Sequence, residues 1–195
     1  MSDKRLSIAI IDENQLRAAI LEDGLRASGV ETVTVIRDRV NLLRKLVMID
    51  PDVVIIDLEN PSRDELEQMF QVSRVVARPV AMFVDQSDSA MIEAAVDAGV
   101  SAYVVDGLKG ERIKAVVDMA ISRFNAFSRL QGELEQARSE LADRKVIDQA
   151  KGILMKSKGL SEQEAYELMR KTAMNQNRKL AEIAQSVVIA AGLLK

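Results

Sequence analysis

The chain has 195 residues, of which 48% are hydrophobic and 29% charged, with a formal net charge of −3 and neither Cys nor His. The lack of these two residue types excludes disulfides, thiolate zinc sites and histidine-based acid–base catalysis. No apolar run approaches the roughly 18 residues that cross a membrane, and the first ten residues lack the hydrophobic region of a signal peptide. We therefore expect a cytoplasmic protein that does not enter the membrane.

Residues 1–122 alternate between short apolar runs and helical patterns. Because the apolar runs lack polar alternation, they are typical of strands buried on both faces of a parallel sheet. The expected strands are 7–11, 32–36, 52–56, 79–84 and 101–105, and the expected helices are 15–28, 40–48, 63–76, 90–98 and 110–123. This order predicts a flavodoxin-like α/β domain with a five-stranded parallel sheet, whose functional edge lies at the carboxyl ends of the strands.

Three carboxylates fall at that edge. Asp12 and Glu13 follow the first strand, and Asp57 follows the third. Converging carboxylates make an oxygen-rich pocket suited to Mg²⁺, and an Asp beside a bound metal ion can accept a phosphoryl group. This pattern resembles the response-regulator receiver domain, and the resemblance implies that Asp57 is the phosphorylation site and that Asp12 and Glu13 are metal ligands.

The chain departs from the receiver pattern at two positions. Where the family has Ser or Thr at the end of the fourth strand, this chain has Val84 followed by Asp85, and the Lys-Pro pair after the fifth strand is replaced by Asp106 and Gly107. Lys109 lies nearby but out of register. Losing the hydroxyl and the ammonium removes two contacts to a phosphoryl group, so we expect a receiver fold that does not switch by phosphorylation, with control by a docked partner protein instead.

Residues 123–143 continue as one helix with an a/d seam of about two heptads. The seam residues are Phe127, Leu130, Leu134, Ala137 and Leu141. We expect this connector to form a coiled coil in a homodimer, with the domains at either end adding stability to a short seam. The alternative is a helix packed within its own chain.

Residues 144–195 predict three short helices. Apolar residues recur at helical spacing up to Leu154, Gly159 ends that helix, and Ser161 with Glu164 forms a capping box that opens the next. A third apolar set begins at Leu180. So small a core favours an interaction module over an enzyme.

The last segment also differs from the first domain in net charge. Residues 144–179 hold nine Lys or Arg against four Asp or Glu, a net of +5, whereas residues 1–122 have a net of −7. Clustered cations neutralise phosphates and release their counterions, which indicates a polyanion partner. A solvated helical face is the alternative that charge alone leaves open.

Three ordered blocks, "DQAKGILM", "SEQEAYELMRKTAM" and "NRKLAEIA", resemble the ANTAR domain, the RNA-binding module of bacterial transcription antiterminators. The resemblance implies binding to paired stem-loops in a leader transcript, which prevents a terminator from folding. Cations would hold the backbone and polar side chains would reach the splayed loop bases. The phosphate candidates are Arg144, Lys145, Lys151, Lys156, Arg170, Lys171, Arg178 and Lys179, and the base candidates are Gln149, Asn175 and Asn177.

Three further residues of this segment have two interpretations each. Tyr166 has the spacing of a core residue, although an exposed tyrosine could stack on a base. Ala150 and Gly152 are small, which favours either close approach of RNA or tight packing of another helix.

The order of domains resembles AmiR and NasT type regulators, with NasT the better match. That resemblance implies a nitrate or nitrite sensor protein of the NasS type as the restraining partner. We find no P-loop, no glycine-rich dinucleotide motif and no nucleophile elbow, so we expect no enzyme activity and no cofactor besides Mg²⁺ at the acidic pocket. The alternative functions are a DNA-binding two-component response regulator, with a helix-turn-helix in the last segment, and a protein-binding adaptor.

Overall fold

The computed structural model describes residues 6–105 and 112–193. Its contacts divide the chain into two compact units, an N-terminal unit of Met1–Ser128 and a C-terminal unit of Arg129–Lys195. Helix α5 (Ile113–Lys158) contributes to both. The predicted limits of the connector, at 123 and 143, both fall inside this continuous helix, as expected for a segment that continues the last helix of the first domain.

The N-terminal unit is built on the predicted five-stranded parallel sheet. The strands are β1 (Ser7–Ile11), β2 (Thr32–Ile36), β3 (Val53–Leu58), β4 (Val80–Val84) and β5 (Ala102–Val105), in the order β2-β1-β3-β4-β5. The prediction that Asp57 follows the third strand was wrong in detail, because β3 extends to Leu58 and pairs Asp57 with Phe83 of β4. The carboxylate is therefore held by a strand in the middle of the sheet.

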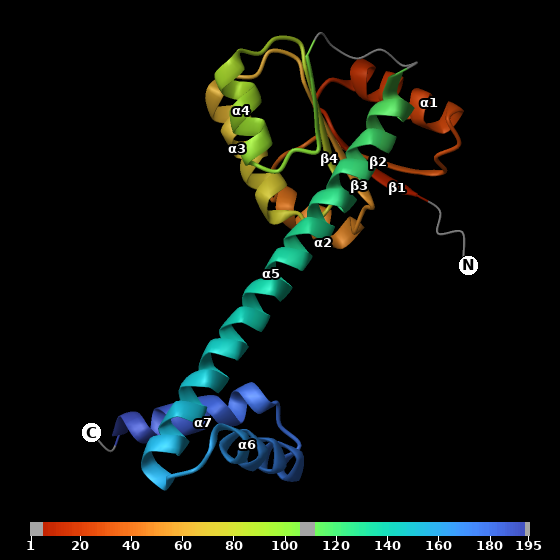
Figure 1. Ribbon diagram of the computed structural model, residues 1–195. Coiled ribbons are helices and arrows are strands. Elements are labelled where there is room, and N and C mark those ends of the chain that lie inside the picture. The colour runs from red at the N-terminus through yellow and green to blue at the C-terminus, as the bar shows by residue number, and fades with distance from the viewer. Residues whose placement is uncertain (1–5, 106–111, 194–195) are drawn as a thin grey trace. The chain divides into compact units, whose positions relative to one another are not determined.

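Helices cover both faces of this sheet, as Figure 1 shows. The four short helices are α1 (Gln15–Ala27), α2 (Leu42–Ile49), α3 (Arg63–Val75) and α4 (Ser89–Asp97). One apolar core joins the sheet to α2, α3 and α4, and the other joins it to α1 and the start of α5. Burial of both faces explains the apolar character of the central strands β1, β3 and β4. The expectation of burial on both faces was wrong for the edge strand β2, where Thr32 is exposed and residues 33–35 are partly buried.

Side-chain caps fix where the helices of this unit begin. Asn14 accepts hydrogen bonds from the first backbone N–H groups of α1, and Ser62 with Glu65 forms a capping box at α3. The side chain of Asp88 caps α4 by accepting a hydrogen bond from the backbone N–H of Met91. Such caps satisfy N–H groups that have no partner inside the helix, and the first of them positions the opening turn of α1 over the edge of the sheet.

The C-terminal unit joins the last turns of α5 to α6 (Glu162–Gln176) and α7 (Leu180–Leu193), which confirms the three predicted helices. Gly159 has a φ of 70° and directly follows the last residue of α5. A residue with a side chain would be strained in this left-handed conformation, so glycine suits the end of the helix. The predicted capping box of Ser161 and Glu164 opens α6. The small core consists of Ala150, Leu154, Ala165, Met169, Ala173, Ile183 and Ala184.

Within the described ranges, no helix combines the length and the apolar character needed to cross a membrane.

Candidate functional site

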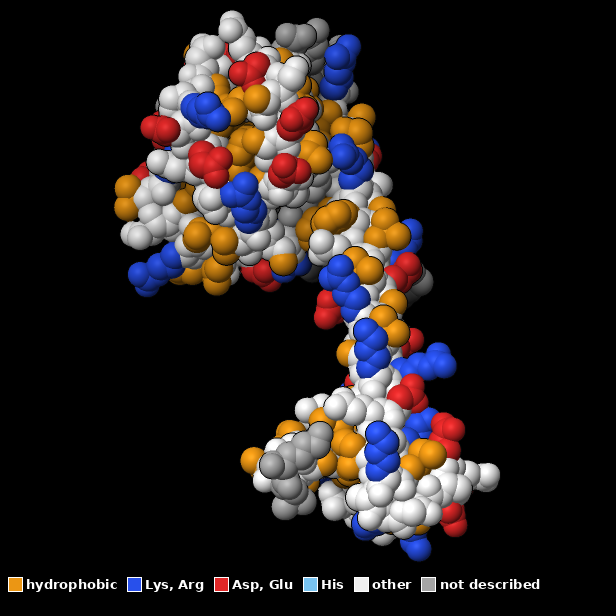
Figure 2. All heavy atoms as spheres, turned by 60° about the vertical axis from the view of Figure 1, so that its left-hand side comes forward, with side chains coloured by type: hydrophobic (Ala, Val, Ile, Leu, Met, Phe, Trp, Pro, Cys, Tyr) orange, Lys and Arg blue, Asp and Glu red, His pale blue; other side chains and the backbone are white. Residues whose placement is uncertain are grey.

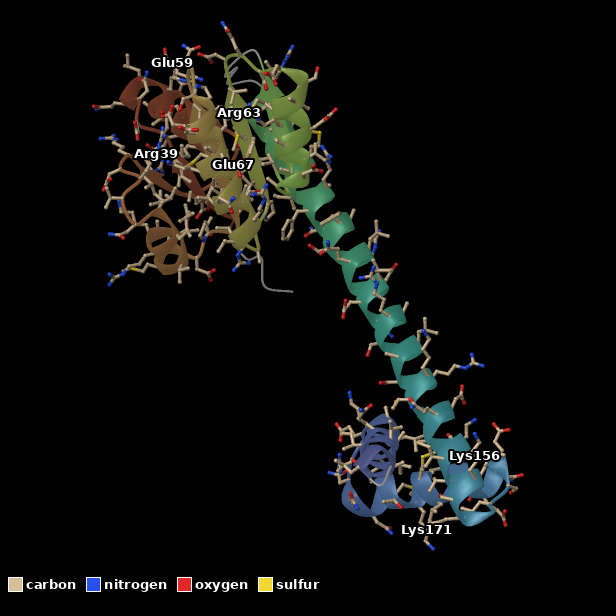
Figure 3. The ribbon with its side chains drawn as sticks, turned by 90° about the vertical axis from the view of Figure 1, so that its left-hand side faces the viewer. Arg39, Glu59, Arg63, Glu67, Lys156 and Lys171 are labelled. Atoms are coloured by element: carbon tan, nitrogen blue, oxygen red, sulfur yellow. The ribbon has the colours of Figure 1, made fainter. Side chains whose placement is uncertain are left out.

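The cations of the C-terminal unit differ in whether a carboxylate already binds them. Lys151 contacts two carboxylates, and Arg178 contacts Glu182 at 3.2 Å. The other predicted phosphate-binding cations are exposed and form no ion pair with any residue that the structure describes; they are Arg144, Lys145, Lys156, Arg170, Lys171 and Lys179. Lys156 on α5 and Lys171 on α6 are labelled in Figure 3. These six side chains are available to a polyanion.

Lys151 holds the turn between α5 and α6. Its Nζ lies 2.8 Å from Oδ1 of Asp148 and 2.6 Å from Oε1 of Glu162, and its side chain is 16% exposed. The hydrogen bonds to Asp148 and then to Glu162 raise the pKa of Lys151, and the same contact lowers the pKa of Asp148. A phosphate would have to compete with both carboxylates for this ammonium group.

Tyr166 lies at the surface, so the interpretation of this residue as core was wrong. It is 40% exposed and lies outside the apolar core of the unit. Arg170 follows one turn later on the same face of α6, and Met174, which is 71% exposed, follows after another turn. An aromatic ring, a guanidinium and a thioether thus share one exposed stripe.

The three base candidates are all exposed, but they lie on different elements. Gln149 is on α5 and Asn175 is near the end of α6. Asn177 ends α6 with a φ of 49°, and its backbone N–H donates to the carbonyl groups of Ala173 and Met174. Asn is one of the few residues that adopts this conformation at low cost, so Asn177 has a structural role in addition to any contact with a base.

The two small residues of α5 differ in their surroundings. Ala150 is fully buried in the core of the C-terminal unit, which favours the helix-packing interpretation. A Cβ atom added at Gly152 would meet no described atom within 4 Å. The space at Gly152 is therefore open to a ligand or to another helix.

The predicted seam of α5 is exposed along its whole length. Phe127, Leu130, Leu134 and Leu141 are between 52% and 60% exposed, and Ala137 is also exposed. Figure 2 shows hydrophobic side chains interspersed with charged ones along this stretch of helix. The described residues of each unit leave these side chains unburied.

All three predicted residues of the acidic edge of the N-terminal unit line one pocket, and two of the three are buried. Asp12 and Asp57 are 4% and 2% exposed, whereas Glu13 is exposed and its Oε1 lies 2.9 Å from Nε of Arg39. Arg39, labelled in Figure 3, also contacts Glu65 of α3 at 3.1 Å. Within the part of the chain that the structure describes, no three acidic side chains are placed to hold a metal ion.

Arg17 is the residue of this site that sequence reasoning missed. From the first turn of α1, its Nη2 and Nε donate to the two oxygens of Asp57 at 2.7 and 2.8 Å. Its Nη1 donates to both oxygens of Asp85 at 3.0 Å. A cation in the first turn opposes the helix dipole, and that unfavourable placement five residues after Asp12 was the available signal.

Burial raises the pKa of Asp12, the other buried carboxyl group at this edge. The pKa of Asp12 is raised to about 6, mainly by burial and further by Asp57, against the lowering effect of the backbone N–H of Asn14. One oxygen of Asp12 accepts that N–H at 2.8 Å, and the other has no hydrogen-bond partner among the described atoms. Asp12 thus keeps one buried oxygen unsatisfied at this edge.

The departure from the receiver pattern at the end of the fourth strand has a structural consequence. Val84 is fully buried in β4, and Asp85, directly after it, supplies the second carboxylate to Arg17. The next hydroxyl is that of Ser87, three positions after Val84, and it is hydrogen-bonded to the Tyr103 hydroxyl at 3.0 Å. The departures predicted at Asp106, Gly107 and Lys109 lie outside the described residues.

Two family models match the chain. The response regulator receiver domain matches residues 8–118, and the ANTAR domain matches residues 135–188. The transcriptional regulatory protein PdtaR of Mycobacterium tuberculosis is 27% identical over 188 residues, covering 96% of this chain and 92% of that protein. The nitrate regulatory protein of Klebsiella oxytoca is 30% identical over 80 residues, which cover 41% of this chain and 20% of that protein.

Solved structures share the fold of the N-terminal unit. The signal receiver domain of a modulated diguanylate cyclase from Desulfovibrio desulfuricans is 17% identical, with a TM-score of 0.52, and covers 62% of this chain and 96% of that one. A response regulator receiver domain protein from Methanospirillum hungatei is 13% identical, with a TM-score of 0.53, over 62% of this chain and 97% of that one. At these identities the likeness shows the fold alone.

Proposed function

Because the chain belongs to the family of response regulators that join a receiver domain to an ANTAR domain, we propose that it is a cytoplasmic RNA-binding transcription antiterminator. In this proposal the C-terminal unit binds paired stem-loops in a leader transcript and prevents a terminator from forming. The function is regulatory, with no enzyme activity.

The observation that carries the proposal is the exposed stripe of α6 with free cations around it. Tyr166 and Arg170 present a ring and a guanidinium plane to solvent, and Lys171 is adjacent. Unstacked loop bases bind to aromatic and guanidinium planes, while cations without a carboxylate partner are free to neutralise phosphates. A purely protein-binding adaptor would leave these cations without a polyanion.

A homodimer would match the two stem-loops of the target. The exposed seam from Phe127 to Leu141 is apolar at a/d spacing, which suits a second copy of the same helix. Two RNA modules on one dimer raise the effective concentration of the second binding event. The active state in this proposal is therefore dimeric.

Control by a ligand-sensing protein completes the proposal. PdtaR is named as a transcriptional regulator and the Klebsiella relative as a nitrate regulatory protein, and the similarity to NasT-type regulators supports a nitrate or nitrite sensor of the NasS type as the partner. The regulated genes would then be those for nitrate or nitrite assimilation.

The decisive experiment is a binding titration of the full chain at fixed salt against a two-hairpin leader RNA from its own operon. Selective binding that is lost when either loop is scrambled supports the antiterminator. The same sequence as duplex DNA serves as the comparison, because preference for the duplex would favour a DNA-binding response regulator. Repeating the titration at several salt concentrations gives the number of phosphates that the protein neutralises.

A further inference from the structure

The guanidinium of Arg17 satisfies the carboxylate that defines the acidic edge. The side chain of Asp57 has no exposed surface, and each of its oxygens accepts one hydrogen bond from Arg17. The remaining Nη1 group donates to Asp85, the residue that directly follows β4. Arg17 itself is only 17% exposed, and hydrogen bonding to Asp57 raises the pKa of its guanidinium above the usual value. The charge of this residue is permanent.

A divalent metal ion would need the same oxygens. Mg²⁺ prefers several oxygen ligands in octahedral geometry, with carboxylates supplying the negative charge. Here the guanidinium holds Asp57, and a second arginine, Arg39, holds Glu13. Of the three carboxylates, Asp12 alone keeps a buried oxygen without a hydrogen-bond partner among the described atoms. The residues present do not fit a bound metal ion while these two ion pairs are formed.

We infer that Arg17 is the resident cation of this edge, replacing the divalent metal ion and closing Asp57 to phosphoryl transfer. The same four hydrogen bonds tie α1 to β3 and to Asp85, which follows β4. The N-terminal unit consequently keeps one arrangement whether or not a phosphodonor is present. This inference concerns the receiver domain alone and does not depend on RNA binding.

The test compares the full chain with two variants of α1. Arg17→Gln removes the cation and leaves its carboxylates, and Arg26→Gln removes an exposed cation that pairs with Glu22 on the same helix. Thermal unfolding is followed with 10 mM MgCl₂ and with NaCl of equal ionic strength. We expect Mg²⁺ to raise the midpoint of Arg17→Gln alone, by roughly 2 to 5 °C, because a ligand of the folded state stabilises it. Stabilisation of the wild type by Mg²⁺, or a folded Arg17→Gln variant that does not respond, overturns the inference.

A measurement on the wild-type chain covers the case in which Arg17→Gln does not fold. Mn²⁺ is titrated into ¹⁵N-labelled protein, and the amide signals around Asp12 and Asp57 are followed by NMR. We expect no selective broadening at these positions. Selective broadening there would place a divalent ion at the edge beside an intact Arg17 and would overturn the inference.

Discussion

Lys151 and Glu162 are joined by an ion pair in which Nζ lies 2.6 Å from Oε1, so that the end of α5 is tied to the first turn of α6. The same ammonium also binds Asp148 on its own helix. Lys151 therefore belongs to the fold of the C-terminal unit as well as to the set of cations predicted to contact RNA. Its two roles can be separated by choice of variant.

Replacing Lys151 or Arg170 by Ala is expected to weaken RNA binding by about 1 to 3 kcal/mol if the contact is charge-assisted and desolvated. Affinity is measured at fixed salt, and unchanged affinity removes that residue from the site. Because Lys151 also holds the helix turn, Lys151→Ala should lower the unfolding midpoint as well, whereas the exposed Arg170 should not. Glu162→Gln is the matched control, since it leaves the ammonium in place and should retain RNA binding.

Tyr166 separates stacking from structural support. Tyr166→Ala is expected to weaken RNA binding by about 1 to 3 kcal/mol, the usual worth of a base stacked on an aromatic ring. Tyr166→Phe keeps the ring and should bind nearly as well as the wild type. Circular dichroism and a binding titration give the two readouts, and equal affinities for the two variants would contradict a stacking role.

The seam of α5 predicts an effect on oligomeric state. Leu134 is one of the apolar heptad positions of the seam. Leu134→Asp places a charge there and should shift the protein from dimer to monomer in sedimentation equilibrium. Ser139→Asp lies on the same helix but away from the seam, and it should leave the dimer intact. A wild-type chain that is monomeric in the presence of the two-hairpin RNA would contradict the proposed dimer.

Asp57→Asn is expected to leave antitermination largely intact, because the carboxylate is bound to Arg17 and its expected phosphoryl-binding partners are replaced. A reporter gene downstream of the leader measures this. The variant loses part of a buried ion pair, which can cost about 3 kcal/mol, so its folding must be checked in parallel. Loss of induction in a folded Asp57→Asn protein would count against a receiver that works without phosphorylation.

Asp12 predicts a pH dependence of stability. Its pKa is raised from 3.8 in the unfolded chain to about 6 in the folded protein, so the folded state binds the proton more tightly. The free energy of unfolding therefore includes a favourable contribution that is complete below pH 3.8 and is lost as the pH rises to about 6. Asp12→Asn should match the wild type near pH 4 and exceed it above pH 6, on the order of 2 kcal/mol. Urea unfolding at several pH values checks this, and a difference that stays constant with pH would contradict it.

The sequence by itself determined the elements and their order. Short apolar runs predicted the five strands, and Gly159 with the Ser161 capping box predicted the break between α5 and α6. These features depend on the backbone preferences and hydrophobic spacing of neighbouring residues. The three blocks of the last segment also identified the family to which the chain belongs.

Only the tertiary structure decided which charged groups meet. Arg17 and Asp57 lie 40 positions apart and are brought together because α1 begins at the carboxyl edge of the sheet. Likewise, the packing of α6 against α5 leaves Tyr166 at the surface and brings Glu162 into an ion pair with Lys151. Ion pairing and exposure depend on distances of a few ångströms between separate elements, and residue spacing along the chain does not contain those distances.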